Sequence, residues 1–203
     1  MTTRRQRIIG VAALAVALLA GCSGGDEPDE EATAPTSTPV ITAPPTLTPE
    51  EKAAEEIRAT FEGLVVDLDA YYVNASDYGN GDDITWNAEL VGYWPVRAGA
   101  ERDITNWVAT FRGSEILQVG DTEINSHDVG DVRIQEDFAS AASSRACLDR
   151  SALLFVRYNG DLAILPPEAP EHQVWSMSWS YLPDVSPAGW YLEDIKLTFE
   201  GPC

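Results

Sequence analysis

Apolar residues recur every three or four positions after residue 49, the spacing of one face of an α-helix. The stretch Thr48–Glu51 fits a capping box with proline at the first helical position. Glu55, Glu62 and Asp69 fall on the opposite side. The pattern predicts an amphipathic helix that runs to about Val73, with this apolar face: Ala54, Ile57, Phe61, Leu64, Val65, Leu68 and Tyr72.

A second helix is predicted over Ala100–Phe111, and the polar, glycine-rich stretch Asp77–Asp83 predicts a loop. Further along, Asn159-Gly160 separates the strand-like stretches Ser151–Tyr158 and Asp161–Leu165. An Asn-Gly pair in that setting favours a type I′ turn, so these stretches are predicted to form a β-hairpin.

Period-two alternation marks a strand at Gln173–Leu182, where serines alternate with a ladder of large side chains. The ladder consists of Trp175, Met177, Trp179 and Tyr181. A last strand, Trp190–Phe199, is predicted to place Tyr191, Ile195, Leu197 and Phe199 on one side. Helices followed by strands predict an α+β fold, in which N-terminal helices pack on a curved antiparallel sheet.

The N-terminal segment has the parts of a secretion signal. Three arginines precede an apolar run, Ile8–Ala20, which is shorter than the roughly 20 residues of a membrane-spanning helix. The run ends in Leu19-Ala20-Gly21-Cys22, which resembles the lipobox of bacterial lipoproteins. The resemblance implies that residues 1–21 are removed and that Cys22 carries the lipid anchor, on the extracytoplasmic face of the cell membrane. The alternative is an ordinary signal peptide with an incidental cysteine.

Residues 22–49 have the composition of a tether. The stretch Ala32–Pro49 holds six threonines, five prolines and no aromatic residue. Such a segment buries too little apolar surface to offset its chain entropy, so it is predicted to stay extended and disordered. The folded domain is therefore predicted to occupy residues 50–203.

Several features of that domain resemble one family. They are the long first helix, the stretch Ala146–Ser151, the Asn159-Gly160 hairpin, the stretch Gly189–Asp194 and the terminal Cys203. Together they resemble secreted actinobacterial lipoproteins with a cystatin-like cone, the fold shared with nuclear transport factor 2 and the SnoaL-like cyclases. The resemblance implies a fold but no single activity, because this fold serves enzymes, binding modules and assembly domains alike.

Charge and composition exclude several functions. The net charge of −20, from 33 acidic and 13 basic residues, argues against binding to nucleic acid. It also argues against an electrostatic membrane patch, so contact with the membrane is expected through Cys22 alone. Three cysteines and two histidines leave little material for a metal centre, and no metal or other cofactor is expected.

The remaining two cysteines form an even pair. With Cys22 lipidated, Cys147 and Cys203 are left in an oxidising compartment, which favours a structural disulfide between them over two free thiols. Neither cysteine has a histidine close to it in the sequence, and acidic surroundings raise the pKa of a thiol. Cysteine catalysis is therefore not expected.

Other candidates for chemistry have simpler explanations. His127 and His172 are both predicted to be exposed loop positions, and Asp149 is predicted to cap a turn at the end of a strand. Asp77–Asp83 lacks the spacing of a calcium-binding loop, because Gly79 and Gly81 replace expected ligands. No catalytic residue is therefore assigned.

The aromatic ladder is the most informative surface for function. It either lines a cone that holds a small apolar ligand, or it forms the core face on which the first helix packs. We expect a membrane-anchored envelope lipoprotein whose domain binds such a ligand or another envelope protein. One alternative is a SnoaL-like enzyme that uses a carboxylate in the cone. Another is a phage- or element-encoded lipoprotein that blocks entry at the cell surface.

Overall fold

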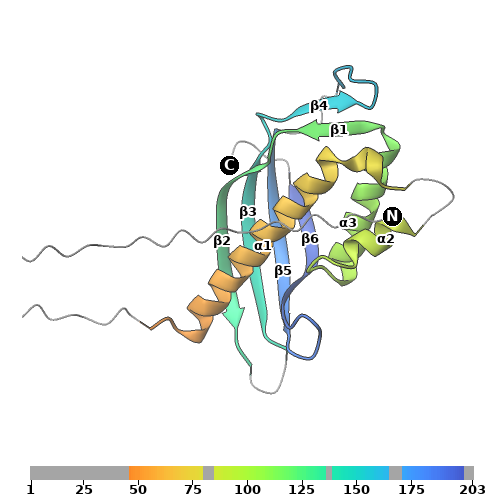
Figure 1. Ribbon diagram of the computed structural model, residues 1–203. Coiled ribbons are helices and arrows are strands. Elements are labelled where there is room, and N and C mark those ends of the chain that lie inside the picture. The colour runs from red at the N-terminus through yellow and green to blue at the C-terminus, as the bar shows by residue number, and fades with distance from the viewer. Residues whose placement is uncertain (1–45, 80–84, 136–138, 165–170, 199–203) are drawn as a thin grey trace, which may run out of the picture. The chain divides into compact units, whose positions relative to one another are not determined.

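The computed structural model describes residues 46–79, 85–135, 139–164 and 171–198 (Figure 1). The chain divides after Ala43 into two units, and the described residues all belong to the second. The predicted signal peptide, Cys22 and most of the predicted tether therefore lie outside the described residues. Within the described part of the chain, no helix is long and apolar enough to cross a membrane.

Helix α1 spans Pro49–Val73 and begins as predicted. The Oγ1 atom of Thr48 accepts a hydrogen bond from the backbone N–H of Glu51 at 3.1 Å, and the Glu51 carboxylate accepts one from the N–H of Thr48 at 2.8 Å. This reciprocal capping box satisfies two donors that would otherwise lack partners at the start of the helix. The predicted helix and its N-terminal boundary are confirmed.

Two further helices complete the helical layer. Helix α3, Ala98–Gly113, confirms the second predicted helix and extends it at both ends. The short helix α2, Trp86–Val91, and a 3₁₀ turn at Ala75–Asp77 were not predicted. Both are too short for apolar residues to recur over several turns, so periodicity does not reveal them.

The main sheet has four antiparallel strands in the order β2-β3-β5-β6, and α1 crosses one face of it (Figure 1). The strands are β2 (Glu123–Arg133), β3 (Ala141–Asp149), β5 (His172–Leu182) and β6 (Gly189–Thr198). Helices on one face of an antiparallel sheet confirm the predicted α+β class. The shared core lies between α1, α3 and the covered face of the sheet.

The prediction that Tyr191 shares a face of the last strand with Ile195 was wrong. Ser178 pairs with Asp194 but Trp179 pairs with Leu192, so Glu193 is an extra residue in β6. This β-bulge reverses the alternation along the strand. Leu192 and Ile195 therefore both face the core, and Tyr191 lies on the other side.

A second, two-stranded sheet pairs β1 (Ile116–Val119) with β4 (Leu154–Arg157). The predicted hairpin is present after β4, but its turn is not type I′. Gly160 has a φ of 91°, whereas a type I′ turn also needs a positive φ at Asn159. The N–H of Gly160 donates a hydrogen bond to the carbonyl oxygen of Arg157 at 2.8 Å. The N–H of Arg157 donates one to the carbonyl oxygen of Asp161 at 2.7 Å. This pattern is a three-residue loop with a glycine bulge.

Candidate functional site

A cavity of about 190 Å³ lies between the C-terminal half of α1, helix α3 and the covered face of the sheet. Its walls come from α1 and α3, from three strands of the main sheet, and from the segments before β2 and after β3. The lining residues are Val65, Leu68, Asp69, Tyr72, Trp107, Thr122, Leu148, Arg150, Gln173, Trp175 and Leu197.

Two tryptophans form the apolar part of the cavity. The rings of Trp107, from α3, and Trp175, from β5, meet edge to face with their centroids 5.5 Å apart. Leu68 and Leu148 are buried beside them. Rigid aromatic and aliphatic walls of this kind suit a small apolar group.

Arg150 supplies a positive charge at the cavity. It directly follows β3, and its guanidinium lies over the ring of Phe155, 5.5 Å from the centroid. Burial lowers the pKa of Arg150, while Tyr72 and Asp69 act in the opposite direction. The guanidinium forms no ion pair or hydrogen bond with another side chain among the described residues. A partly desolvated guanidinium in this state is a strong donor for an incoming acceptor.

Tyr72 adds a hydroxyl group. Burial raises the pKa of Tyr72 to about 12, and the charge of Arg150 only partly offsets this. The hydroxyl is therefore protonated near neutral pH and is able to donate a hydrogen bond. Its ring packs on Phe111 at a centroid distance of 4.4 Å, which fixes the side chain at the cavity wall.

Asp69 is the carboxylate at the cavity, and its predicted place on the solvent side of α1 was wrong. The residue is 7% exposed. One carboxylate oxygen accepts hydrogen bonds from Gln118 Nε2 at 2.7 Å and Thr122 Oγ1 at 2.8 Å. The other accepts one from the backbone N–H of Thr122 at 2.6 Å. The carboxylate therefore joins α1 to the turn between β1 and β2.

The sequence did contain an indication that Asp69 is buried. Asp69 lies four residues after Val65 and three before Tyr72, which places it within the apolar face of the predicted helix. A carboxylate within an apolar face has hydrogen-bond partners when it is buried. Arg150 had no such signal, because its place at the cavity depends on the turn after β3.

The aromatic ladder divides between the core and the wall of the cavity. Met177 and Trp179 are buried in the core, and Trp179 Nε1 donates a hydrogen bond to Ser144 Oγ at 2.8 Å. Trp175 is also part of the core but lines the cavity. Tyr181 is half-buried and lies away from the cavity, with its ring 5.6 Å from that of Trp190.

The predicted loop position of His127 was wrong. His127 lies within β2, and its ring packs on that of Phe61 in α1 at a centroid distance of 4.5 Å. Both ring nitrogens are buried and have no hydrogen-bond partner among the described residues. Burial lowers the pKa of His127 to about 4, and the charge of Arg58 contributes. The ring lines no part of the cavity, so it has no reacting partner there.

His172 and Asp149 form a pair at the end of the sheet. His172 begins β5 and is half-buried, not in an exposed loop, and its Nε2 atom is 3.5 Å from Asp149 Oδ2. Asp149 caps a turn as predicted, because its Oδ1 atom accepts a hydrogen bond from the N–H of Ser151 at 2.8 Å. That hydrogen bond is the main reason why the pKa of Asp149 is lowered.

Two other predicted sites extend beyond the described residues. Cys147 is disulfide-bonded, but Cys203 lies outside the described residues, so their pairing stays a prediction. The stretch Asp77–Asp83 is described only as far as Gly79. Among the described residues, no three histidine, cysteine, aspartate or glutamate side chains gather closely enough to hold a metal ion.

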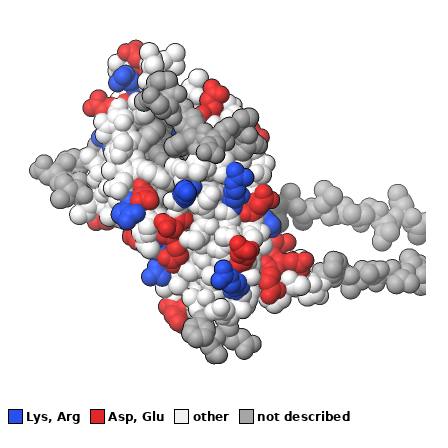
Figure 2. Space-filling view, turned by 180° about the vertical axis from the view of Figure 1, so that it is seen from behind, with Lys and Arg blue, Asp and Glu red and all other residues white. Residues whose placement is uncertain are grey.

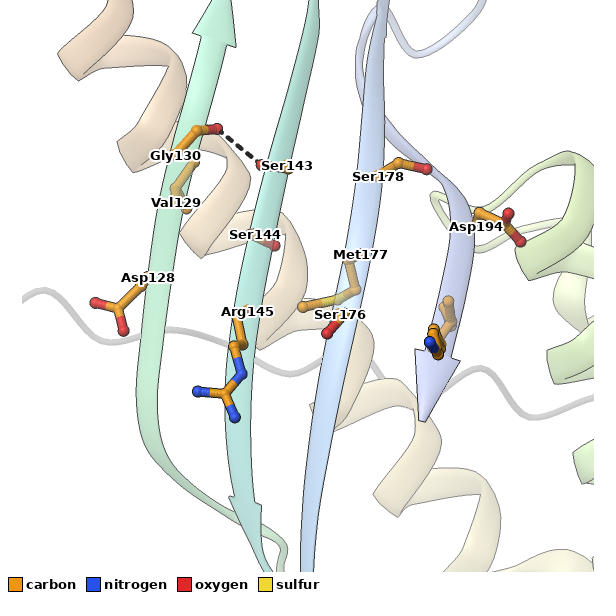
Figure 3. A pocket seen from close by; sticks show the side chains of 12 residues that line it. Asp128, Val129, Gly130, Ser143, Ser144, Arg145, Ser176, Met177, Ser178 and Asp194 are labelled. Carbon is orange, nitrogen blue, oxygen red and sulfur yellow. Dashed lines mark hydrogen bonds between the residues drawn. The ribbon is translucent and has the colours of Figure 1, made fainter. Parts of the chain in front are cut away.

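The opposite face of the main sheet carries a wider, shallower hollow of about 550 Å³ (Figure 3). Cross-strand pairing places Asp128, Arg145, Ser176 and Lys196 in one row across the four strands. Figure 2 shows basic and acidic side chains interspersed on the side of the molecule opposite to Figure 1. Short serines between charged groups leave this hollow open to water, so the less open cavity beside Arg150 is the better candidate for ligand binding.

No protein-family model matches the chain, and no curated protein matches it. Solved structures that match include the intermembrane space region of the chloroplast protein ARC6, with 12% identity and a TM-score of 0.37. That match covers 70% of this chain and 96% of the other. A Catenulispora acidiphila structure in complex with S-DNPA has 11% identity and a TM-score of 0.33, covering 70% and 90% of the two chains. Another from that organism has 13% identity and a TM-score of 0.32, covering 71% and 88%. Structural similarity at this level does not establish a family or a function for this chain.

Proposed function

We propose that this chain is a lipid-anchored extracytoplasmic binding protein that takes up a small carboxylate ligand with an apolar body. The observation that carries the proposal is the partly desolvated guanidinium of Arg150 beside the tryptophan-walled cavity. Apolar walls with a few convergent polar groups are typical of sites for small molecules. Arg150 would pair with the carboxylate, and Tyr72 would donate a further hydrogen bond to it.

The size of the cavity limits the ligand. An apolar cavity of about 150 Å³ is able to hold one benzene molecule, and this one measures about 190 Å³. A single ring or a short acyl chain therefore fits, with the carboxylate placed toward Arg150. A sterol or a full-length lipid chain would not fit inside.

Binding is favoured over catalysis because of the state of Asp69. Its carboxylate already accepts three hydrogen bonds, from Gln118 and Thr122. A general base needs a lone pair within reach of the proton that it removes, and these bonds occupy three of the about four lone-pair sites of a carboxylate. The SnoaL-like enzyme that uses a cone carboxylate is therefore the weaker of the two functions.

The cellular setting of the proposal comes from the sequence. The lipobox-like segment that ends in Cys22 would hold the chain at the extracytoplasmic face of the cell membrane, and residues 23–47 would separate the domain from the anchor. The four-stranded sheet crossed by α1 supports a cystatin-like cone, of the kind shared with nuclear transport factor 2, as the fold of this domain.

Isothermal titration calorimetry on the full chain in detergent tests the proposal. Benzoate and hexanoate should bind saturably, and benzyl alcohol should bind more weakly, because it lacks the charge that pairs with Arg150. Arg150→Gln should weaken benzoate binding about 10- to 100-fold, which is the range for a hydrogen bond to a charged group. Arg145→Gln, on the opposite sheet face, is the matched control and should leave binding unchanged. Absence of saturable binding, or equal affinity in Arg150→Gln, would contradict the proposal.

A further inference from the structure

A separate groove lies along another side of α1. It measures about 470 Å³ and is bounded by one face of the helix, by residues 92–95 between α2 and α3, and by residues 186–191 at the start of β6. The helix contributes Ala59, Gly63 and Asp67, which are spaced four residues apart and share one face. None of these three residues lines the cavity beside Arg150.

The walls of the groove are aromatic and rigid. Trp94 and Trp190 line the groove but are only 7% and 3% exposed, so their positions are fixed by packing. The Tyr191 hydroxyl donates a hydrogen bond to the carbonyl of Pro187 at 2.7 Å, which ties the loop to the strand. In contrast, Tyr93 is 89% exposed. Because Tyr93 lines the groove, its ring is free to contact an occupant.

Gly63 is the unusual residue at the base of the groove. Glycine destabilises the interior of a helix relative to alanine, and Gly63 lies in the middle of α1. A Cβ atom built on Gly63 would meet nothing within 4 Å, so packing within the described chain does not require glycine here. Glycine does allow a second backbone to approach closely. A residue that weakens the helix without serving the packing indicates an occupant of the groove.

Charge indicates what kind of occupant fits. Asp67 lies one helical turn after Gly63 and is the charged residue that lines the groove. Partial burial raises the pKa of Asp67, and its carboxylate forms no ion pair with another described residue. An occupant with a basic group at this end would supply the missing counter-charge. A second copy of this chain, with its net charge of −20, would be repelled.

The groove and an adjoining hollow together match the length of an extended peptide. The adjoining hollow of about 420 Å³ shares Trp190 with the groove and reaches the first turn of α1 at Pro49. From Pro49 to Asp67 the helix rises about 27 Å. A polyproline II segment covers that distance with about nine residues.

We propose that this groove docks a proline-rich segment of a partner protein, with a lysine or arginine at the Asp67 end. Aromatic-lined grooves bind the polyproline II helix because it is already extended and loses little entropy on binding. A glycan is less suitable, because sugar rings stack on open aromatic faces and both tryptophans are more than nine-tenths buried. This surface is independent of the cavity beside Arg150.

Fluorescence polarisation with a labelled decapeptide of eight prolines and two C-terminal arginines tests the proposal on the full chain. We expect saturable binding to the wild type, at least fivefold weaker binding to Asp67→Asn, and at least tenfold weaker binding to Gly63→Gln. Gln fills the groove but favours helix, so the melting temperature of Gly63→Gln should not fall. Val66→Gln places the same side chain three residues away, outside the groove, and should bind as the wild type does.

Four outcomes would overturn the proposal. They are no binding, equal binding to Gly63→Gln, equal binding of a peptide that carries two glutamates in place of the arginines, and Gly63-dependent binding of chitotetraose. A fifth concerns the chain itself. If a peptide of residues 32–45 binds more tightly than the basic probe and also depends on Gly63, the occupant is the chain's own proline-rich segment and not a partner.

Discussion

Acidification should destabilise the domain through His127. The imidazole packs on Phe61 under α1, and both of its nitrogens are buried without a partner among the described residues. Burial is the larger cause of its lowered pKa and the charge of Arg58 is the smaller, while Asp128 on the same strand acts in the opposite direction. Protonation would place a positive charge on a ring whose nitrogens are buried and have no hydrogen-bond partner among the described residues.

The direction of the effect follows from the two pKa values. His127 has a pKa of about 4 in the folded chain against an ordinary value of 6.5. Between pH 6.5 and pH 4 the imidazole is protonated in the unfolded chain but not in the folded chain. The free energy of unfolding is therefore highest above pH 6.5 and falls as the pH approaches 4. From pH 7.5 to pH 4.5 the loss amounts to about 2–3 kcal/mol, since one pKa unit corresponds to about 1.4 kcal/mol. For a domain of this size that is a fall of roughly 5–10 °C in melting temperature.

Urea denaturation followed by circular dichroism at pH 7.5 and pH 4.5 measures this loss. His127→Leu replaces the imidazole with an apolar side chain and should remove most of the pH dependence. His172→Asn is the control, because His172 lies at the end of the sheet beside Asp149 and should leave the dependence as in the wild type. If His127→Leu loses as much stability on acidification as the wild type, the explanation is wrong.

Three further predictions follow from the sequence and the fold. Metabolic labelling with a fatty-acid analogue should mark the wild type but not Cys22→Ala, and labelling that survives the substitution would refute the lipobox assignment. A bridge between Cys147 and Cys203 would contribute about 4 kcal/mol in the chain-entropy model, so Cys203→Ser should lower the melting temperature by several degrees. Two alkylatable thiols in the unreduced protein would contradict that bridge. Asp69→Ala should cost about 2–4 kcal/mol in urea denaturation, because buried donors of Gln118 and Thr122 lose their acceptor, and a loss below about 1 kcal/mol would show that water replaces it.

Capping motifs and hydrophobic periodicity predicted the helices and strands whose formation depends on neighbouring residues in the sequence. The capping box at Thr48 fixed the start of α1, and alternation in β5 identified the buried side of Trp175. The alternation of apolar and polar residues gave a wrong prediction where a single extra residue interrupts the strand. The bulge at Glu193 reverses the faces of β6, and no propensity of the residues around it signals the change.

The site was harder to predict than the fold, because it depends on contacts between distant segments. Arg150 reaches the cavity only through the turn after β3, and its neighbour Tyr72 is far away in the sequence. His127 sits in a polar stretch that is typical of a turn, but pairing with β3 makes it a strand. Tertiary context decides such positions, and single-residue preferences do not.

The hydrogen bonds of Asp69 also bear on how the cavity would respond to the proposed ligand. Because Gln118 and Thr122 hold one side of the cavity through polar contacts, that side is shaped before any ligand arrives. A preorganised site loses little conformational entropy on binding, and it adapts poorly to larger ligands. Discrimination among ligands should therefore be steric and abrupt, with one added ring enough to abolish binding.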